Sequence, residues 1–217
     1  MNSIFSVALF LPVAYLLGSI PSSVWIGKRF FGVDVRKHGS GNAGATNTFR
    51  VLGKKAGSIV LSLDILKGWV ATQLPVWLHT EADIDRLFLW QMAFGLCAIL
   101  GHVYSVFLNF KGGKGVATSL GMAISLHWGA SAIAVVVFLV VLLLSHFVSL
   151  GSMLATLAFA LVVSFDLLGS TSLYFKYFAW LMVALVTYTH RSNIRRLLQG
   201  NENKVYLFKS KKSARES

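Results

Sequence analysis

The sequence is 217 residues long, and its 55% hydrophobic and 13% charged residues exclude a soluble globular fold, in which about a quarter of the residues are charged. The 20 Lys and Arg residues outnumber the 8 Asp and Glu residues and give a net charge of +12, which in an apolar chain is typical of cytoplasmic loops or of an anionic partner other than nucleic acid. A single cysteine excludes a disulfide framework and a cysteine metal site.

Apolar runs follow one another along the chain and are separated by polar connections. In chain order they are Ile4–Ile26, Ala56–Leu78, Leu87–Leu108, Val116–His127, Ser131–Leu144, Gly151–Leu168 and Leu173–Thr189. A membrane-crossing helix needs about 20 mostly apolar residues, so we predict an all-α integral membrane protein with about seven transmembrane helices. The fourth and fifth runs are short and can instead form one long bent segment. We expect a single polytopic membrane domain over residues 1–217, with residues 208–217 as a flexible basic tail.

Basic residues gather in alternate connections. The first connection, Lys28–Lys55, and the tail from Arg191 are rich in Lys and Arg, whereas the second connection is mostly acidic. The positive-inside rule therefore predicts an N-terminus outside and a C-terminus in the cytoplasm. The segments on the cytoplasmic side are then Lys28–Lys55, Asn109–Gly115, Ser145–Leu150 and His190–Ser217. All the polar motifs share this side, which indicates one assembled site, and the lack of an internal repeat counts against a transporter.

The first connection contains a glycine-rich, acid-poor stretch, VRKHGSGNAGATNTF from Val35 to Phe49. Such a stretch can turn tightly and point backbone N–H groups at an anion. It contains G-x-G-x-x-G, but no βαβ pattern surrounds it, so a dinucleotide fold is rejected. A plain flexible loop is the alternative.

The third connection, NFKGGKG from Asn109 to Gly115, precedes an apolar run. Glycines before a helix N-terminus, with Lys111 and Lys114 beside them, can offer N–H groups and cations to a phosphate. The pattern is not a Walker loop, because Gly115 follows Lys114 where Ser or Thr is required. The alternative is a positively charged turn at the lipid headgroups.

The tail begins with His190, and on a helix continuing from the last run His190 and Asn193 share one face while Arg191 and Arg195 share another. A basic anchor at the membrane interface explains the arginines but not the histidine with the asparagine. Within the second run, one helix face can hold both Asp64 and Lys67, and the default interpretation is a structural ion pair.

Three stretches carry a resemblance to a known family. They read GSGNAGATN at 39–47 followed by Arg50, GHVYSVFLNFKGGKGVAT at 101–118, and HRSNIRRLLQGNE at 190–202. With GSIP at 18–21 and DILKG at 64–68, they resemble, in order and over nearly the whole chain, the PlsY-type acyl-phosphate:glycerol-3-phosphate acyltransferases of bacterial membranes. The second stretch departs from the family pattern only at Val103–Ser105.

The resemblance implies roles for individual residues. The residues needed for activity would be Ser40, Arg50, His190 and Asn193. The glycerol 3-phosphate site would contain Gly112, Gly113, Lys114 and Gly115, and the further candidate phosphate ligands are Lys111, Asn42 and Arg191. Glu202, Asp64 and Lys67 would give structural support.

The implied reaction transfers an acyl group from acyl phosphate to the 1-hydroxyl of glycerol 3-phosphate and yields lysophosphatidate and phosphate, the first acylation step of phospholipid synthesis. The expected partners are these two substrates and membrane lipids, and no cofactor or metal is expected. The expected location is the bacterial cytoplasmic (inner) membrane, with the active site facing the cytoplasm. Either His190 or the acceptor's own phosphate can take the hydroxyl proton. An anion transporter and a non-enzymatic membrane scaffold are the alternatives from other classes.

Overall fold

The computed structural model describes residues 7–78 and 83–206, so the expected flexible tail at 208–217 lies outside the described residues. Within the described ranges the regular elements are helices, which confirms the predicted all-α class. The chain divides into two compact units, unit 1 up to Ser131 and unit 2 from Ala132 onward.

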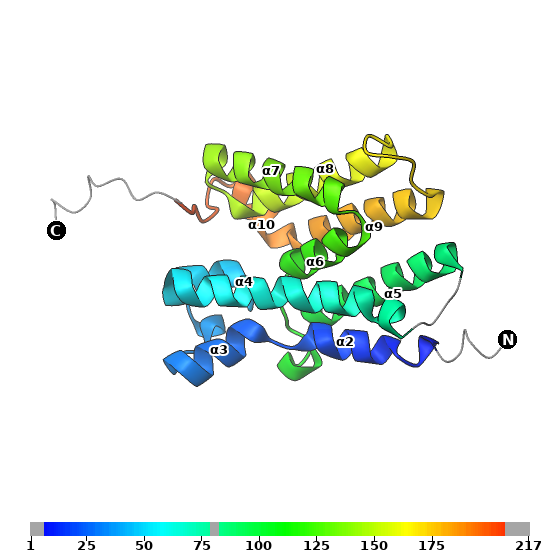
Figure 1. Ribbon diagram of the computed structural model, residues 1–217. Helices are drawn as coiled ribbons and strands as arrows, with labels where there is room; N and C mark the ends of the chain where they lie inside the picture. The colour runs from blue at the N-terminus through cyan, green and yellow to red at the C-terminus, as the bar shows by residue number, and fades with distance from the viewer. Residues whose placement is uncertain (1–6, 79–82, 207–217) are drawn as a thin grey trace, which may run out of the picture. The chain divides into compact units, whose positions relative to one another are not determined.

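Unit 1 is built around one long central helix. Its elements are α2 (Leu11–Ser19), α3 (Ser22–Phe31), η1 (Val35–Lys37), α4 (Ala45–Trp77), α5 (Ile84–Val103), η2 (Val106–Leu108), α6 (Val116–Leu126) and the start of α7 (Trp128–Ser145). The central helix α4 contacts α2, α3, α5 and α6, and Figure 1 shows α2, α4 and α5 side by side.

Glycines allow these helices to approach closely. A side chain at Gly18 of α2 would overlap the backbone of Ala98 in α5, and one at Gly68 of α4 would overlap the backbone of Thr118 in α6. Small residues at helix contacts are typical of membrane proteins, in which association depends on close van der Waals packing. The glycines of the apolar runs therefore hold the frame that carries the connections.

The first predicted run does not form one helix. Helix α2 ends at Ser19 and α3 begins at Ser22, with Ile20 (ψ 113°) and Pro21 (ψ 69°) outside helical geometry. Proline disfavours the helical conformation at the residue before it and has no N–H to donate, which explains the break. The prediction of a continuous helix to Ile26 is therefore wrong.

The second predicted run lies within α4, but this helix begins at Ala45, eleven residues before the predicted start at Ala56. The last part of the expected first connection is therefore helical. Gly53 interrupts the helical geometry with φ 84° and ψ −175°, which places a kink just before the apolar stretch. Residues on both sides of the kink belong to the same packed unit.

The fourth and fifth predicted runs form two helices, α6 and α7, which favours two elements over one bent segment. They separate at His127, which has non-helical geometry and whose Nδ1 accepts the N–H of Ala130 at 3.2 Å. Among the described residues, three helical segments are long and apolar enough to cross a membrane: Ala45–Trp77, Ile84–Leu108 and Trp128–Ser145. Helices α6, α8 and α9 are apolar but shorter. The count of seven spans and the orientation of the termini stay predictions.

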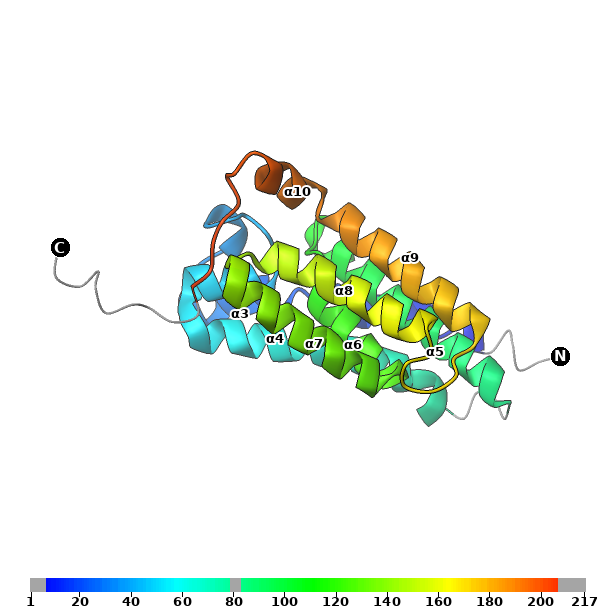
Figure 2. The ribbon, with the colours of Figure 1, turned by 90° about the horizontal axis from the view of Figure 1, so that it is seen from above.

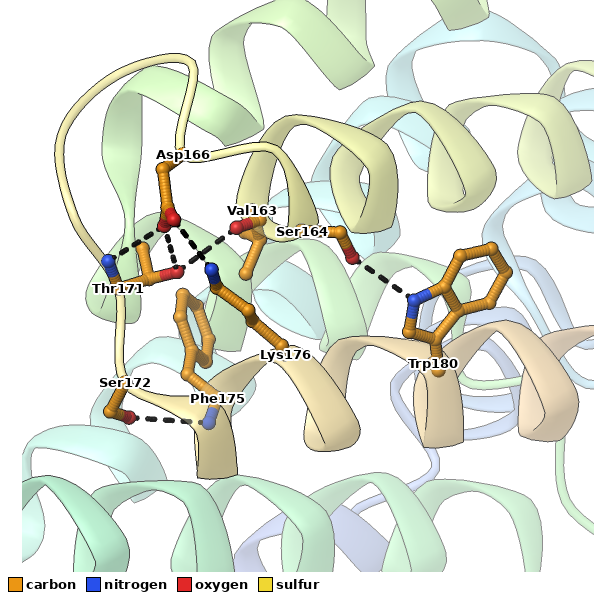
Figure 3. A network of polar contacts seen from close by, with 8 residues as sticks. All are labelled: Val163, Ser164, Asp166, Thr171, Ser172, Phe175, Lys176 and Trp180. Atoms are coloured by element: carbon orange, nitrogen blue, oxygen red, sulfur yellow. Dashed lines mark hydrogen bonds and ion pairs between the residues drawn. The ribbon is translucent and has the colours of Figure 1, made fainter.

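Unit 2 contains the rest of α7, α8 (Val148–Ser164), α9 (Leu173–Thr189) and α10 (Arg191–Leu198). Helices α8 and α9 form a hairpin and lie side by side in Figure 2. Figure 3 shows how the connection between them is fixed: Asp166 accepts hydrogen bonds from Thr171 and pairs with Lys176 Nζ at 2.5 Å.

The tail helix does not continue straight from α9. The helical geometry ends at Thr189, His190 has φ −96° and ψ 7°, and α10 begins at Arg191, so the chain turns at the histidine (Figure 2). The predicted separation of faces is nevertheless present. His190 and Asn193 are buried, whereas Arg191 and Arg195 are exposed.

Candidate active site

The glycine-rich loop between η1 and α4 is organised by one buried amide, that of Asn47, which is 1% exposed. Its Oδ1 accepts the backbone N–H of Ser40 at 2.8 Å, and its Nδ2 donates to the carbonyls of Val35 and His38 at 2.8 and 3.1 Å. The carbonyls of Val35 and His38 also accept the N–H groups of His38 and Gly41, so the amide joins a hydrogen-bonded turn. Ser40 is exposed in this turn, and a role of the turn in binding an anion stays a prediction.

Gly39 is required by this geometry for two reasons. Its φ of 61° lies in the left-handed region, and a side chain there would overlap Asn47 Oδ1. An added Cβ at Gly39 would also lie 3.4 Å from Arg50 Cδ, so the stem of Arg50 passes beside the turn that holds Ser40. Ser40 and Arg50, which were both predicted as catalytic, therefore lie at the same turn, and both are exposed.

An ion-pair cluster closes the start of the loop. Asp34 caps η1 and accepts Arg36 Nε at 3.0 Å and Nη2 at 2.7 Å, with Lys28 Nζ 3.5 Å away. The Arg36 hydrogen bond holds the pKa of the Asp34 carboxyl well below its usual range, and the same bond raises the pKa of Arg36. The carboxylate therefore stays charged and compensates much of the local positive charge.

An open cavity of about 400 Å³ lies beside this cluster. It is lined by Asp34, Arg36, Lys37, Gly41, Asn42, Lys111 and Gly112. Three cations against one carboxylate leave a net positive cavity, which favours an anion. The structure thus brings the first and second motifs together within unit 1.

The cavity includes only some of the predicted phosphate ligands. Asn42, Lys111 and Gly112 line it, whereas Gly113, Lys114 and Gly115 do not. Sequence reasoning missed Arg36 and Lys37 as cavity residues, since it used them only to assign orientation. Their position directly before the glycine-rich turn was the signal that could have identified them.

The glycine loop before α6 does not present its N–H groups as expected. The N–H of Gly112 donates to the carbonyl of Val103, and that of Gly113 donates to the carbonyl of His102, both at 3.0 Å. These two donors are therefore bonded to the end of α5, and the interpretation that they point at a phosphate is wrong. Glycine is needed because a side chain at Gly112 would overlap the His102 carbonyl oxygen. A role for the loop in binding phosphate stays a prediction.

The predicted pair of Asp64 and Lys67 is present. Lys67 Nζ lies 2.9 Å from Asp64 Oδ1, and both side chains are buried on one face of α4. The small enclosed pocket beside them is lined by Gly112 and Gly113, among others. The pair therefore lies beside the glycine loop.

In unit 2, Glu202 ties the tail to α8 and α10. Its Oε1 accepts Ser149 Oγ at 2.8 Å and Asn193 Nδ2 at 2.6 Å, and its Oε2 accepts Arg196 Nε at 2.8 Å. Burial alone raises the pKa of Glu202, but the hydrogen bonds from Asn193, Arg196 and Ser149 outweigh burial and lower it below its ordinary value. The carboxylate has the geometry of a structural anchor.

His190 and Arg191 have different surroundings. His190 is buried, and its Nδ1 lies 2.8 Å from the carbonyl oxygen of Val186. A carbonyl can only accept, so Nδ1 is the donor in this contact. Arg191 is exposed, donates to the Tyr188 carbonyl at 3.1 Å and lies over the Tyr188 ring at 4.6 Å. Arg191 is thus held against Tyr188 near the end of α9.

Across residues 7–78 and 83–206, no group of three His, Cys, Asp or Glu side chains is placed to hold a metal ion. The candidate functional groups are cations, amides and a serine in unit 1, and a histidine, an amide and a carboxylate in unit 2. Ser40, Arg50 and the basic cavity belong to unit 1, and His190, Asn193 and Glu202 belong to unit 2.

Comparison with known proteins gives a consistent result. The family model described as glycerol-3-phosphate acyltransferase matches residues 8–200. A protein of Enterococcus faecalis named glycerol-3-phosphate acyltransferase is 45% identical, with 92% of each chain covered. One of Bacillus cytotoxicus with the same name is 44% identical, covering 96% of this chain and all of the relative.

Solved structures agree. The crystal structure of PlsY (YgiH), an integral membrane glycerol 3-phosphate acyltransferase in its glycerol 3-phosphate form, matches with a TM-score of 0.82 and 38% identity, covering 93% of this chain and 96% of that chain. Its lysophosphatidic acid form matches with a TM-score of 0.79 and 37% identity over the same shares. With apolar helices, an ordered glycine-rich motif beside a basic cavity, and relatives that match nearly from end to end, this chain belongs to the glycerol-3-phosphate acyltransferase family of integral membrane proteins, the PlsY family.

Proposed function

We propose that this protein acylates the 1-hydroxyl of glycerol 3-phosphate and produces lysophosphatidate. The observation that carries the proposal is the basic cavity between the first and second motifs, which presents Arg36, Lys37 and Lys111 together with the amide of Asn42. Glycerol 3-phosphate is small, hydrophilic and doubly anionic, and it complements a cavity of this charge. The PlsY structures matched above carry the names of the proposed acceptor and product.

We propose an acyl phosphate as the donor. The predicted cytoplasmic segments total only about 70 residues once spans of roughly 20 residues are removed, which leaves little chain to bind a nucleotide-containing thioester. An acyl phosphate needs one anion site, and its apolar tail can enter between the helices from the lipid. The acceptor oxygen bonds to the acyl carbonyl carbon, the bond from that carbon to the phosphate oxygen breaks, and inorganic phosphate leaves.

The catalytic roles are assigned to the turn in unit 1 and the tail in unit 2. Ser40 and Arg50 interact with the phosphate of the acyl phosphate or with the developing oxyanion. A charged hydrogen-bond donor such as Arg50 contributes most where negative charge develops. The hydroxyl proton passes to a phosphate oxygen of the acceptor, whose second pKa lies near neutrality. His190 orients the hydroxyl, as the resemblance to the PlsY-type family implies. Asn193 fixes the tail beside the histidine through its bond to Glu202.

We also propose the expected placement: seven spans, an N-terminus outside, and a site on the cytoplasmic face of the bacterial inner membrane. The excess of Lys and Arg in Lys28–Lys55 and in the tail supports this orientation.

The test is turnover by purified protein with a long-chain acyl phosphate and glycerol 3-phosphate as the only substrates. We expect lysophosphatidate and inorganic phosphate in equal amounts, and no product when acyl-CoA or an acylated carrier protein replaces the acyl phosphate. Turnover with acyl-CoA alone would overturn the donor assignment and leave the acceptor assignment standing.

A set of lysine variants tests the cavity itself. Lys37→Ala and Lys111→Ala, which both remove a cavity cation, should each raise the KM for glycerol 3-phosphate at least about fivefold. Lys55→Ala removes an exposed lysine of α4 that does not line the cavity, and it should behave as wild type. Equal effects of all three would mean that only overall charge matters.

A further inference from the structure

Three ionisable side chains are buried together in unit 1, where α2 breaks. Asp64 and Lys67 of α4 are 2% and 8% exposed, and His102 of α5 is 8% exposed. Burying charged groups is costly, and such groups persist where they are paired and where they serve a purpose. The contacts of each show what that purpose is.

Lys67 and Ser22 both contact Asp64 at the break between α2 and α3. Lys67 Nζ pairs with Asp64 Oδ1 at 2.9 Å and donates to the Ile20 carbonyl at 2.9 Å, and Ser22 Oγ donates to the same Asp64 oxygen at 3.1 Å. The break at Pro21 leaves the carbonyls at the end of α2 without helical partners. Lys67 therefore stabilises the break, and Asp64 compensates the lysine.

His102 is not needed for the break. Its Nδ1 lies 3.8 Å from Asp64 Oδ1, on the side of the cluster that faces the glycine loop. Its backbone carbonyl accepts the N–H of Gly113 at 3.0 Å, and its ring Nε2 fills the space that a Gly113 side chain would occupy. The histidine therefore contacts the loop through both its backbone and its ring.

Gly112 lines two spaces. One is a small pocket of about 10 Å³ that Asp64, Lys67, His102 and Gly113 also line. The other is the basic cavity, which Lys111 also lines. Because glycines have no side chains to pack, the position of the loop depends on the side chains that contact it.

We propose that His102 is a positioning residue: it contacts Gly113 and so supports the Lys111–Gly115 loop, which then keeps the geometry that binds the phosphate of glycerol 3-phosphate. This assignment rests on the proposed function. His102 touches neither substrate, and its effect is transmitted through the backbone of the loop.

Substitution of a purely structural histidine would reduce the amount of folded protein or lower kcat. Substitution of a positioning residue raises the KM for one substrate. His102→Ala should raise the KM for glycerol 3-phosphate at least about tenfold, while kcat and the KM for the acyl phosphate change less than about twofold. His102→Gln, which keeps a polar side chain of similar reach, should recover most of the affinity. Loss of kcat with an unchanged KM would overturn the assignment.

A pair of double-mutant cycles tests the contact itself. Gly113→Ala places a methyl group against the His102 ring and also 2.9 Å from the Ala43 carbonyl oxygen, so a change of the His102 side chain relieves the larger overlap and leaves the smaller one. Gly112→Ala places a methyl group against the His102 backbone carbonyl, which no change of the His102 side chain relieves. Gly112→Ala is thus the matched control, one residue away.

The expected result is coupling at one glycine and not at the other. In the His102→Ala background, Gly113→Ala should raise the KM for glycerol 3-phosphate at least about threefold less than in the wild-type background, in which it raises the KM at least about tenfold; a part of the effect remains because the Ala43 carbonyl is still close. The effect of Gly112→Ala should be the same in both backgrounds. If His102→Ala does not yield folded protein, the cycles are run with His102→Gln, and the same contrast is expected in weaker form.

The outcomes separate this inference from the function it rests on. A wild-type protein that forms no lysophosphatidate from glycerol 3-phosphate contradicts the proposed function. An active wild type in which Gly113→Ala and His102→Ala act independently contradicts the support of the loop by His102 and leaves the function intact.

Discussion

Loss of the Glu202 carboxylate should detach the tail that carries Asn193. The Glu202 side chain is 6% exposed and accepts three hydrogen bonds, from Ser149, Asn193 and Arg196. A hydrogen bond to a charged group contributes about 1.5–3 kcal/mol, but such contributions are not additive, and Arg196 is partly exposed. We therefore expect Glu202→Ala to cost about 3 kcal/mol of local stability, and Glu202→Gln, which keeps an acceptor oxygen, about half of that.

Hydrogen exchange of the α10 amides measures this opening directly, since exchange reports local unfolding free energies. A tenfold change in the opening equilibrium corresponds to about 1.4 kcal/mol. Glu202→Ala should therefore speed hydrogen exchange of α10 roughly hundredfold, and Glu202→Gln roughly tenfold. Asp166→Asn is the control, because Asp166 anchors the α8–α9 connection instead of the tail. Unchanged exchange in Glu202→Ala would refute the role of the carboxylate as an anchor.

The same carboxyl sets the pH dependence of the tail. Its pKa in the folded protein lies below the ordinary value of 4.5, so the ionised form contributes stability that is fully present above that value. The stability is lost as the pH falls through the lowered pKa. Protection of α10 should therefore decline below pH 4.5 in the wild type, and Glu202→Gln, which has no proton to bind there, should show a smaller decline. An identical decline in both proteins would assign the effect to another group.

Three other predictions test orientation, the turn and the catalytic serine. In a Cys97→Ser background, a cysteine at Asp83 should react with an impermeant reagent on intact cells and one at Lys204 only after permeabilisation, and the reverse pattern would contradict a cytoplasmic site. Gly39→Ala should abolish most activity, because the methyl group would displace Asn47, whereas Gly32→Ala, at a similar φ of 65° but with open space, should cost only about 1 kcal/mol of stability. Ser40→Ala should lower kcat/KM at least about tenfold, or about 1.4 kcal/mol, and full activity would leave Ser40 as part of the turn only.

The sequence predicted well the features that depend on composition and local spacing. Helix α9 spans the predicted residues, Leu173–Thr189, and Asp64 and Lys67 form the pair expected from their spacing of three. Hydrophobicity over a long run and the i, i+3 rule are local properties, so no tertiary information was needed.

The features that the sequence did not reveal depend on local conformation or on distant contacts. A single Pro21 within an apolar run breaks α2 from α3, and hydropathy averaged over a run does not register one proline. The early start of α4 at Ala45 follows from the ordered turn before it, in which the carbonyl of Gly44 accepts Thr48 N–H and Oγ1. From the sequence, Arg36 and Lys37 served only to predict the membrane orientation, whereas in the fold they line one cavity together with Lys111.

The glycines show most clearly where sequence reasoning stops. Glycine before a helix allows two physical explanations: a backbone N–H that approaches an anion, or a backbone that approaches another backbone. Both require the missing side chain, so the sequence cannot separate them. For Gly112 and Gly113 the donors are bonded to the carbonyls of Val103 and His102, which selects the second explanation. Affinity for a phosphate must then come from cations such as Lys111 in the basic cavity. The glycines contribute by holding those cations in place.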